Sequence, residues 1–348
     1  MPSASLERIS PTQPPLEFAA VGLEHAHIQA QCRGLVTAGA QLKWVYGRDP
    51  AKVGRFRAEF PSAHAAREID EVLGDPAVGL VASAAIPGER GALGCRVLRA
   101  GKDFFTDKAP FTTLAQLAEA RATVATTGRK YLVYFDERLS HGGVRRATEL
   151  VAAGALGRIV HVTSFLPHRL NAAQRPDWFF DREQAGGILG DLAGHAIDQF
   201  LTWTGADDAI VTHAAIRNHA HPEYERFSDH GEMTLATAAG ATGFIRTDWL
   251  SPQGLGTWGD GRSFLVGTEA TLELRKYADV GRAATGNHLF LVDARGEHHL
   301  HAEDSAVGFT QIVADCLHRT ETAMTQQHVF KVAELSLRAQ ALAEGAGA

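Results

Sequence analysis

The chain has 348 residues, of which 45% are hydrophobic and 21% charged, a composition typical of a globular protein large enough for two domains. Its formal net charge of -6 gives no electrostatic reason to expect nucleic acid as a partner. The three cysteines, Cys32, Cys95 and Cys316, are widely spaced, which argues against a disulfide framework and a cysteine zinc site and predicts a reducing, cytoplasmic location.

The beginning of the chain, MPSASLERISPTQPP, differs in composition from the rest. It is rich in serine, proline and threonine, so we expect a flexible tail over residues 1–15. It has neither the apolar core nor the cleavage pattern of a signal peptide. No apolar run in the sequence is long enough to span a bilayer, so no membrane partner is expected.

Short apolar strands alternate with helical segments in the first part of the chain. Strands are predicted at 16–22, 41–47, 78–85, 103–107 and 130–136, and helices at 27–39, 49–60, 91–101 and 112–128. This βαβα order with short connections predicts a doubly wound parallel sheet with right-handed crossovers. Ligands of such sheets lie at the carboxyl ends of the strands.

The pattern changes after about residue 138. Helices are predicted at 142–157, 186–205, 307–320 and 328–345, and strands at 158–168, 210–218, 231–238, 240–249, 262–268, 270–276 and 288–294. Several strands in succession without helices between them predict an antiparallel sheet. The fold class is therefore expected to be α/β, with a parallel sheet followed by an antiparallel one.

The first strand runs into a glycine turn in FAAVGLEHAHIQA, residues 18–30. Gly22 ends the strand and a helix follows, so free backbone N–H groups at the helix start would suit a phosphate. Glu24 and His27 stand where a dinucleotide-binding turn has its second and third glycines, which makes the turn a weak signal by itself. His25 and His27 also admit a metal interpretation, as does EHHLH at residues 297–301. No carboxylate or cysteine spacing completes a site in EHHLH. His25 and His27 lie two apart at a strand–helix turn, where a nucleotide is the better interpretation, so we predict no metal.

Two further segments carry polar groups suited to catalysis. Lys108 follows the strand at 103–107, where a lysine ammonium would hydrogen-bond a substrate oxygen, although a lone lysine is more often a solvated loop residue. Asp191 and His195 are four apart on a predicted helix and share a face, with Asp198 three residues further on the same side. A histidine between carboxylates has a fixed tautomer and a raised pKa, which suits a general base. The alternative is a surface Asp–His pair.

These segments occur together with motifs of one family. DKAP at 107–110 resembles an E-K-P motif, and GGILGDLAGHAID at 186–198 resembles GG-x-x-x-D-x-x-x-H-x-x-D. FDERL at 135–139, followed by ELVAAGALGRIVHVTSF at 149–165, resembles the entry into a second domain. In order and spacing the chain resembles the glucose–fructose oxidoreductase/inositol dehydrogenase/MocA (Gfo/Idh/MocA) family of nicotinamide-dependent oxidoreductases.

The resemblance implies a particular architecture. A Rossmann domain is expected over residues 16–137. It is followed over residues 138–348 by an α/β domain with a large, open, mostly antiparallel sheet for substrate binding and oligomerisation. We expect a homodimer or homotetramer formed through this sheet, and we expect the last helices to pack back toward the Rossmann domain.

The resemblance also implies roles for individual residues. Lys108, Asp191 and His195 are expected to be catalytic, and Arg138 and His168 to bind substrate together with Asp191 and His195. The residues expected to contact the cofactor are Gly22, Glu24, His25, Ala26, His27, Gly47, Arg48, Ala85, Ile86, Pro87, Asp107 and Lys108. The chain departs from the family pattern at the glycine turn, at Asp107 in place of glutamate, and at Ala109, inserted before Pro110.

The ribose-recognition position follows the second strand. An acid there would bind the ribose 2′-hydroxyl and repel a 2′-phosphate, but the chain has Gly47 and then Arg48. Arginine pairs with phosphate through two hydrogen bonds, so NADP is preferred over NAD. The alternative is that Arg48 faces solvent or stacks on adenine with NAD bound.

The function implied is hydride transfer between NAD(P) and a carbinol or carbonyl carbon of a sugar, an inositol or a related cyclic polyol. His195 would move the hydroxyl proton and Lys108 would stabilise the charge on the oxygen; which of them is the proton donor stays open. Two alternatives use the same fold: a non-catalytic nucleotide-sensing regulator, and an enzyme that cleaves glycosidic bonds or eliminates through transient oxidation with a retained cofactor.

Overall fold

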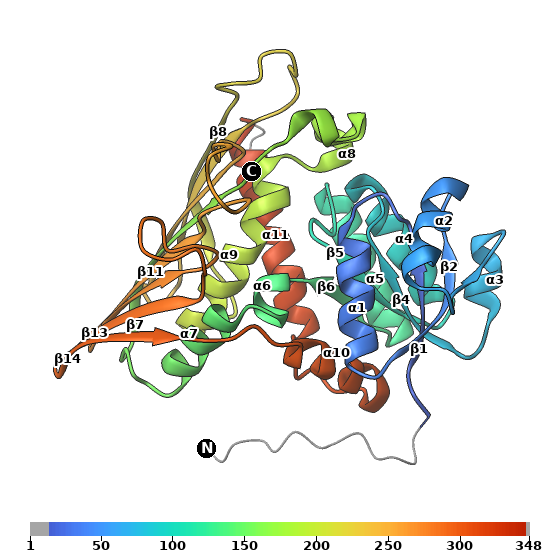
Figure 1. The fold of residues 1–348 in the computed structure, drawn as a ribbon, viewed down its shortest axis with the longest axis horizontal. Coiled ribbons are helices and arrows are strands. Elements are labelled where there is room, and N and C mark those ends of the chain that lie inside the picture. Colours follow the sequence, from blue (N-terminus) through green and yellow to red (C-terminus); the bar gives the residue numbers. More distant parts are fainter. Residues whose placement is uncertain (1–13, 346–348) are drawn as a thin grey trace.

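The computed structural model describes residues 14–345. Nearly all of the tail expected over residues 1–15 therefore lies outside the described residues. Two β-sheets lie side by side, and helices α9 (Ile188–Thr204) and α11 (Gln326–Ala343) lie between them (Figure 1). The predicted α/β class, with one parallel and one mostly antiparallel sheet, is confirmed.

The first sheet has six parallel strands in the order β3-β2-β1-β4-β5-β6. Its strands are β1 (Glu17–Val21), β2 (Gln41–Tyr46), β3 (His64–Ala65), β4 (Val78–Ser83), β5 (Asp103–Asp107) and β6 (Tyr131–Tyr134). Its helices are α1 (His27–Thr37), α2 (Pro50–Glu59), α3 (Ile69–Gly74), α4 (Pro87–Arg99) and α5 (Leu114–Thr127). The chain order reverses between β1 and β4, and a doubly wound sheet binds its ligand at such a point. The sequence patterns missed β3 and α3, because two strand residues and six helical ones show no measurable period.

The second sheet has eight strands in the order β14-β13-β12-β11-β7-β10-β9-β8. They are β7 (Ile159–Pro167), β8 (Ile210–Arg217), β9 (His230–Ala236), β10 (Thr242–Asp248), β11 (Arg262–Gly267), β12 (Thr271–Arg275), β13 (His288–Asp293) and β14 (Gly296–His301). Every pair is antiparallel except β7 with β10. Residues alternate along β7, β10 and β11 between a buried face and a partly exposed one, because one face packs against helices.

Six α-helices belong to the second half of the chain. They are α6 (Asp136–Leu139), α7 (Gly142–Ala152), α8 (Arg182–Ala185), α9 (Ile188–Thr204), α10 (Val307–His318) and α11 (Gln326–Ala343); two 3₁₀ turns, Ala172–Gln174 and Asp177–Phe180, precede α8. Helix α9 is buried along nearly its whole length, between the second sheet and α11. A Cβ at Gly243 on β10 would lie 2.9 Å from the Phe200 ring, so only glycine lets α9 pack this closely.

The last two helices return to the first sheet. Helix α10 packs against α1, and α11 packs against α5 and β6. Through these contacts the end of the chain closes the junction between the two sheets (Figure 1). None of the helices described within residues 14–345 combines the length and the apolar character that crossing a membrane requires.

Candidate functional site

An ion pair joins the two halves of the molecule at this junction. Lys108 directly follows β5, and its Nζ donates a hydrogen bond of 2.8 Å to Asp191 Oδ1 in the first turn of α9. The side chains are only 9% and 19% exposed. Burial by itself raises the pKa of Asp191, but the Lys108 ammonium outweighs it and the net pKa is lowered. The pair is therefore charged at neutral pH.

Two histidines lie beside this pair. His195 follows Asp191 by one helical turn, and His168 follows the end of β7. His168 donates from Nδ1 to the Leu166 carbonyl at 3.1 Å, which leaves Nε2 as an acceptor. Burial and then the Lys108 charge lower the pKa of His168 to about 3. Lys108, Asp191, His168 and His195 thus form one electrostatically coupled group.

His195 differs from its expected state. Its pKa is lowered rather than raised, because burial disfavours the imidazolium more than the carboxylate of Glu137 favours it. Asp191 is hydrogen-bonded to Lys108 instead of to His195. Nδ1 of His195 is buried and has no hydrogen-bond partner among residues 14–345. His195 is therefore a neutral base. The carboxylate with the largest effect on its pKa is that of Glu137, which the sequence analysis missed.

Asp198 does not belong to this group. It accepts hydrogen bonds from Arg138 Nε at 2.8 Å and from His328 Nε2 at 2.6 Å. A step of three residues on a helix turns a side chain by about 300°, so Asp198 is displaced from the line that joins Asp191 and His195. Its role is to tie α9 to α6 and α11.

Arg138 also lies apart from this group. The short helix α6 directs it toward the C-terminal half of α9, where it contacts Asp198, Thr202 and His328. It lines a separate cavity of about 290 Å³ between α7, α9 and α10 and does not reach the Lys108–Asp191 pair. The substrate-binding role expected for Arg138 therefore stays a prediction, and in this structure it would concern the second cavity.

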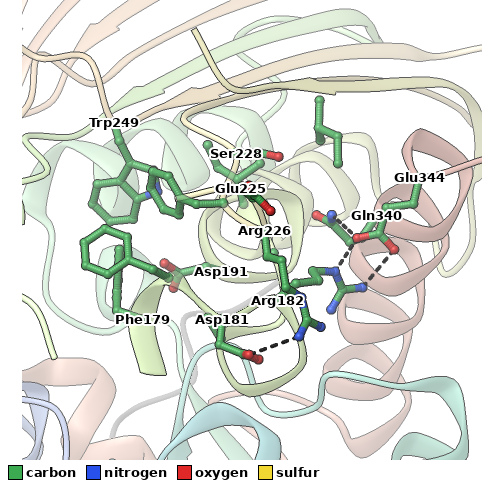
Figure 2. A pocket seen from close by; sticks show the side chains of 16 residues that line it. Phe179, Asp181, Arg182, Asp191, Glu225, Arg226, Ser228, Trp249, Gln340 and Glu344 are labelled. Atoms are coloured by element: carbon green, nitrogen blue, oxygen red, sulfur yellow. Dashed lines mark hydrogen bonds and ion pairs between the residues drawn. The ribbon is translucent and has the colours of Figure 1, made fainter. Parts of the chain in front are cut away.

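A cavity of about 260 Å³ opens from Asp191 toward the second sheet (Figure 2). The aromatic side chains of Phe179 and Trp249 lie at the Asp191 end, and Arg182 pairs with Glu344 at the other. Charged and polar lining residues come from segments far apart in the sequence: Asp181, Arg182, Glu225, Arg226, Ser228, Gln340 and Glu344. Of these lining residues, the sequence analysis assigned a role only to Asp191, because no motif links the segments.

A smaller cavity connects Asp191 with the first sheet. It is lined by His25, Pro87, Arg90, Asp107, Lys108, Trp178, Phe179, Ala185 and Asp191. Four of the residues expected to contact the cofactor, His25, Pro87, Asp107 and Lys108, therefore face the same space. Trp178 also lines it.

The glycine turn has the geometry that a nucleotide phosphate needs. Gly22 has φ +78°, and a Cβ there would lie 2.7 Å from the Cβ of Ala85. Within the described part of the chain, the amides of Leu23, Glu24 and Ala26 donate no hydrogen bond, and α1 starts without a side-chain cap. Free amides at a helix start suit an anion, so the turn fits the diphosphate of a dinucleotide.

The positions of Glu24 and Arg48 qualify this fit. One carboxylate oxygen of Glu24 is buried and accepts no hydrogen bond from any residue between 14 and 345. It is an oriented acceptor that suits a ribose hydroxyl better than a phosphate. Arg48 lies just after β2, is 62% exposed, and forms an ion pair with Glu89. Gly47 packs against Leu23 and Val53 and leaves room for no larger residue without a shift.

Comparison with known proteins identifies the family. Residues 144–273 match the family model described as the GFO/IDH/MocA C-terminal domain. A candidate oxidoreductase of known crystal structure, from Erwinia carotovora atroseptica SCRI1043, is 42% identical to this chain. Its superposition covers 93% of this chain and 98% of that chain, with a TM-score of 0.90. The chain belongs to the Gfo/Idh/MocA family.

Curated members of the family are more distant. A D-xylose dehydrogenase from Paenarthrobacter nicotinovorans is 27% identical over 58% of this chain and 56% of its own length. The scyllo-inositol 2-dehydrogenase (NADP(+)) of Bacillus subtilis strain 168 is 25% identical over 53% of this chain and 50% of its own length. The chain thus spans about half the length of the curated relatives it matches.

Proposed function

We propose that this protein is an NAD(P)-dependent oxidoreductase that transfers hydride between the nicotinamide and a carbinol or carbonyl carbon of a sugar, an inositol or a related cyclic polyol. The observation that carries the proposal is the Lys108–Asp191 ion pair. It lies between the glycine turn, which fits a nucleotide, and the cavity of about 260 Å³ beside Asp191, whose polar lining suits hydroxyl groups. The curated xylose and scyllo-inositol dehydrogenases support the substrate class.

The roles of the side chains follow from their charge states. When bound, the nicotinamide accepts or supplies hydride. Lys108 donates a hydrogen bond to the substrate oxygen and stabilises negative charge on it, and Asp191 keeps the ammonium oriented. His195 and His168 are neutral and have free acceptor nitrogens, so either receives a hydroxyl proton or hydroxyl hydrogen bond.

We infer NADP as the preferred cofactor. Arg48 is the cation that follows β2, and its exposed guanidinium is held by a single surface ion pair with Glu89. Exchange of that carboxylate for a 2′-phosphate costs little, because exposed ion pairs contribute about 0–1 kcal/mol. The NADP-dependent scyllo-inositol dehydrogenase is a relative that supports this assignment.

We also propose that the enzyme acts in the cytoplasm, because its three cysteines are free and buried.

The experiment that tests the function is a thermal-shift screen with NADP, NAD and a panel of polyols, followed by absorbance at 340 nm. A ligand that binds only the folded state stabilises it by RT ln(1 + [L]/Kd), which is about 2.7 kcal/mol at 100 times Kd. We expect a larger shift with NADP than with NAD, and net NADPH formation with at least one polyol.

The other outcomes have distinct meanings. No shift with either nucleotide contradicts the cofactor assignment. A shift without turnover on any polyol supports the nucleotide-sensing regulator instead. Product formation without net change at 340 nm supports transient oxidation with a retained cofactor.

A further inference from the structure

The modified glycine turn brings two histidines against a buried carboxylate. His27 Nδ1 lies 2.9 Å from Asp107 Oδ1, and His25 Nδ1 lies 3.5 Å from Asp107 Oδ2. One ligand atom from each residue lies within 4.8 Å of the other two. The sequence analysis predicted no metal at His25 and His27 and assigned their turn to a nucleotide. The fold supplies a third ligand from β5, eighty positions away from His27 in the chain.

The protonation of His25 favours a cation in this space. Its Nδ1 accepts the backbone N–H of His27 at 3.2 Å, so this nitrogen carries a lone pair and no proton. An acceptor nitrogen and a carboxylate oxygen of Asp107 then face one another at 3.5 Å. A metal binds an imidazole nitrogen through its lone pair, so a bound ion would replace the His27 N–H as the partner of His25 Nδ1.

We propose that His25, His27 and Asp107 bind a divalent transition-metal ion. Two imidazole nitrogens and one carboxylate oxygen are a ligand set that suits zinc, iron, cobalt and nickel. Ligand atoms on a tetrahedral ion with bonds of about 2.0–2.1 Å lie about 3.3 Å apart. The measured separations are 2.9 Å from His27 Nδ1 to Asp107 Oδ1 and 3.5 Å from His25 Nδ1 to Asp107 Oδ2, so each histidine lies near this spacing from one of the two carboxylate oxygens.

The surroundings of the cluster support the site. Asp107 Oδ1 also accepts the Lys108 backbone N–H at 2.9 Å, and Asp107 Oδ2 accepts from Arg90 at 3.3 Å. Arg90 is itself held by the Ala85 and Ala109 carbonyls, so the carboxylate is fixed in orientation, as ligating carboxylates are. The Arg90 charge weakens the attraction for a cation, and we therefore expect exchangeable rather than permanent binding.

The site is also accessible. The His27 side chain is 38% exposed, which provides an entry path. His25 and Asp107 line the smaller cavity together with Lys108 and Asp191. Three protein ligands leave at least one coordination position open, and it faces the crevice that receives the cofactor and substrate in the proposed function.

The test is a titration of untagged, metal-stripped protein with Co²⁺ and Zn²⁺ in the absence of nucleotide. We expect one ion per chain, a visible Co²⁺ absorption band, and a Zn²⁺-dependent rise in melting temperature. His27→Gln should remove all three signals. Because His27 is partly exposed, this variant is expected to fold, which its melting curve without metal will verify.

A matched control comes from the second histidine cluster, on β13 and β14. His299 lies 3.0 Å from His288, and His299→Gln should leave metal binding unchanged. Absence of binding to the wild-type chain, or equal loss in His27→Gln and His299→Gln, would overturn the proposal. Nucleotide is left out of the titration, so a negative result leaves the proposed oxidoreductase function to its own thermal-shift test.

Discussion

Lys108 is the residue on which both halves of the molecule converge. Its backbone N–H donates to Asp107, its carbonyl accepts from Arg90, and its ammonium donates to Asp191. The residue is thus fixed at three points, and it lines the smaller cavity together with Asp191. Because these contacts fix the position of Lys108, a substitution of this residue tests the proposed mechanism directly.

We predict that Lys108→Met lowers turnover by about 10²–10³-fold, because it removes the ammonium that would stabilise negative charge on the substrate oxygen. Nucleotide affinity should stay within a few fold of the wild type, since the glycine turn is untouched. Steady-state rates at 340 nm and a nucleotide titration measure the two effects. The control is Lys331→Met, which alters a lysine of α11 that pairs with Asp208. This variant should keep the turnover of the wild type. Wild-type turnover in Lys108→Met would remove this residue from the mechanism.

Arg48 and Glu89 form a second pair that tests the choice of cofactor. Arg48→Ala should weaken NADP binding by about tenfold or more, the value of a charge-assisted hydrogen bond, and leave NAD binding unchanged. Glu89→Gln should act in the opposite direction, because it frees the guanidinium and removes a negative charge beside the 2′-phosphate. Isothermal titration of the wild type and both variants with each nucleotide gives the six dissociation constants to compare. Equal weakening of NAD and NADP by Arg48→Ala would instead indicate stacking on adenine.

At the scale of elements, a buried polar network fixes α6, α9 and the end of β12 relative to one another. Lys276 is fully buried and donates to Glu137 at 2.5 Å and to Gln199 at 3.1 Å. Tyr277 donates to the other Glu137 oxygen at 2.6 Å. Burial alone would raise the pKa of Glu137, but Lys276 together with the neighbouring His195 and His141 outweighs it, so the net pKa is lowered and the carboxylate is ionised. The charge that acts on His195 therefore depends on this network.

We predict that Lys276→Met lowers the free energy of unfolding by about 3–5 kcal/mol, because it leaves the Glu137 carboxylate buried without its cation. Urea denaturation followed by circular dichroism measures the loss. Arg99→Ala, which breaks an exposed pair with Glu119, should cost less than about 1 kcal/mol. The double variant Glu137→Gln/Lys276→Met should recover part of the loss. A cost for Lys276→Met no larger than that of the control would contradict a coupled buried pair.

At the scale of the whole molecule, the second sheet is covered by helices on one face only (Figure 1). On the other face Phe165 lies between Phe244 and Phe264 at ring distances of 6.5 and 6.2 Å, all three half-buried. Val266 on the same face is 40% exposed. An aromatic sheet face of this kind typically packs against another surface, and a second copy of the chain is the partner that the family resemblance implied.

We predict a homodimer or homotetramer in solution, with a mass that is a multiple of 37.4 kDa in light-scattering chromatography. Phe264→Lys should dissociate it, because the lysine would be buried in an apolar interface, while in the monomer it would lie opposite Glu273. Leu342→Lys, at an exposed position on α11, is the control. A monomeric wild type would exclude this interface.

Local patterns determined the elements and the chemistry of single motifs. The alternation of apolar runs and helical periods was enough to predict both sheets, although not the short strand β3 or helix α3. The spacing of Asp191 and His195 was enough to place them on one helix face. Lys108 was found because a residue just after a parallel strand projects into the crevice. These features depend on neighbours in the chain, whose relative positions follow from the geometry of a strand or a helix.

The tertiary structure alone decided which side chains meet across the junction. It paired Lys108 with Asp191, gave Asp198 to Arg138, placed Glu137 near His195, and brought Asp107 to the two histidines of the turn. It also assembled the cavity beside Asp191 from α8, α11 and the segment between β8 and β9. Such contacts depend on how helices and sheets pack, and burial then sets the pKa values, as the lowered pKa of His195 shows. No spacing along the chain encodes either.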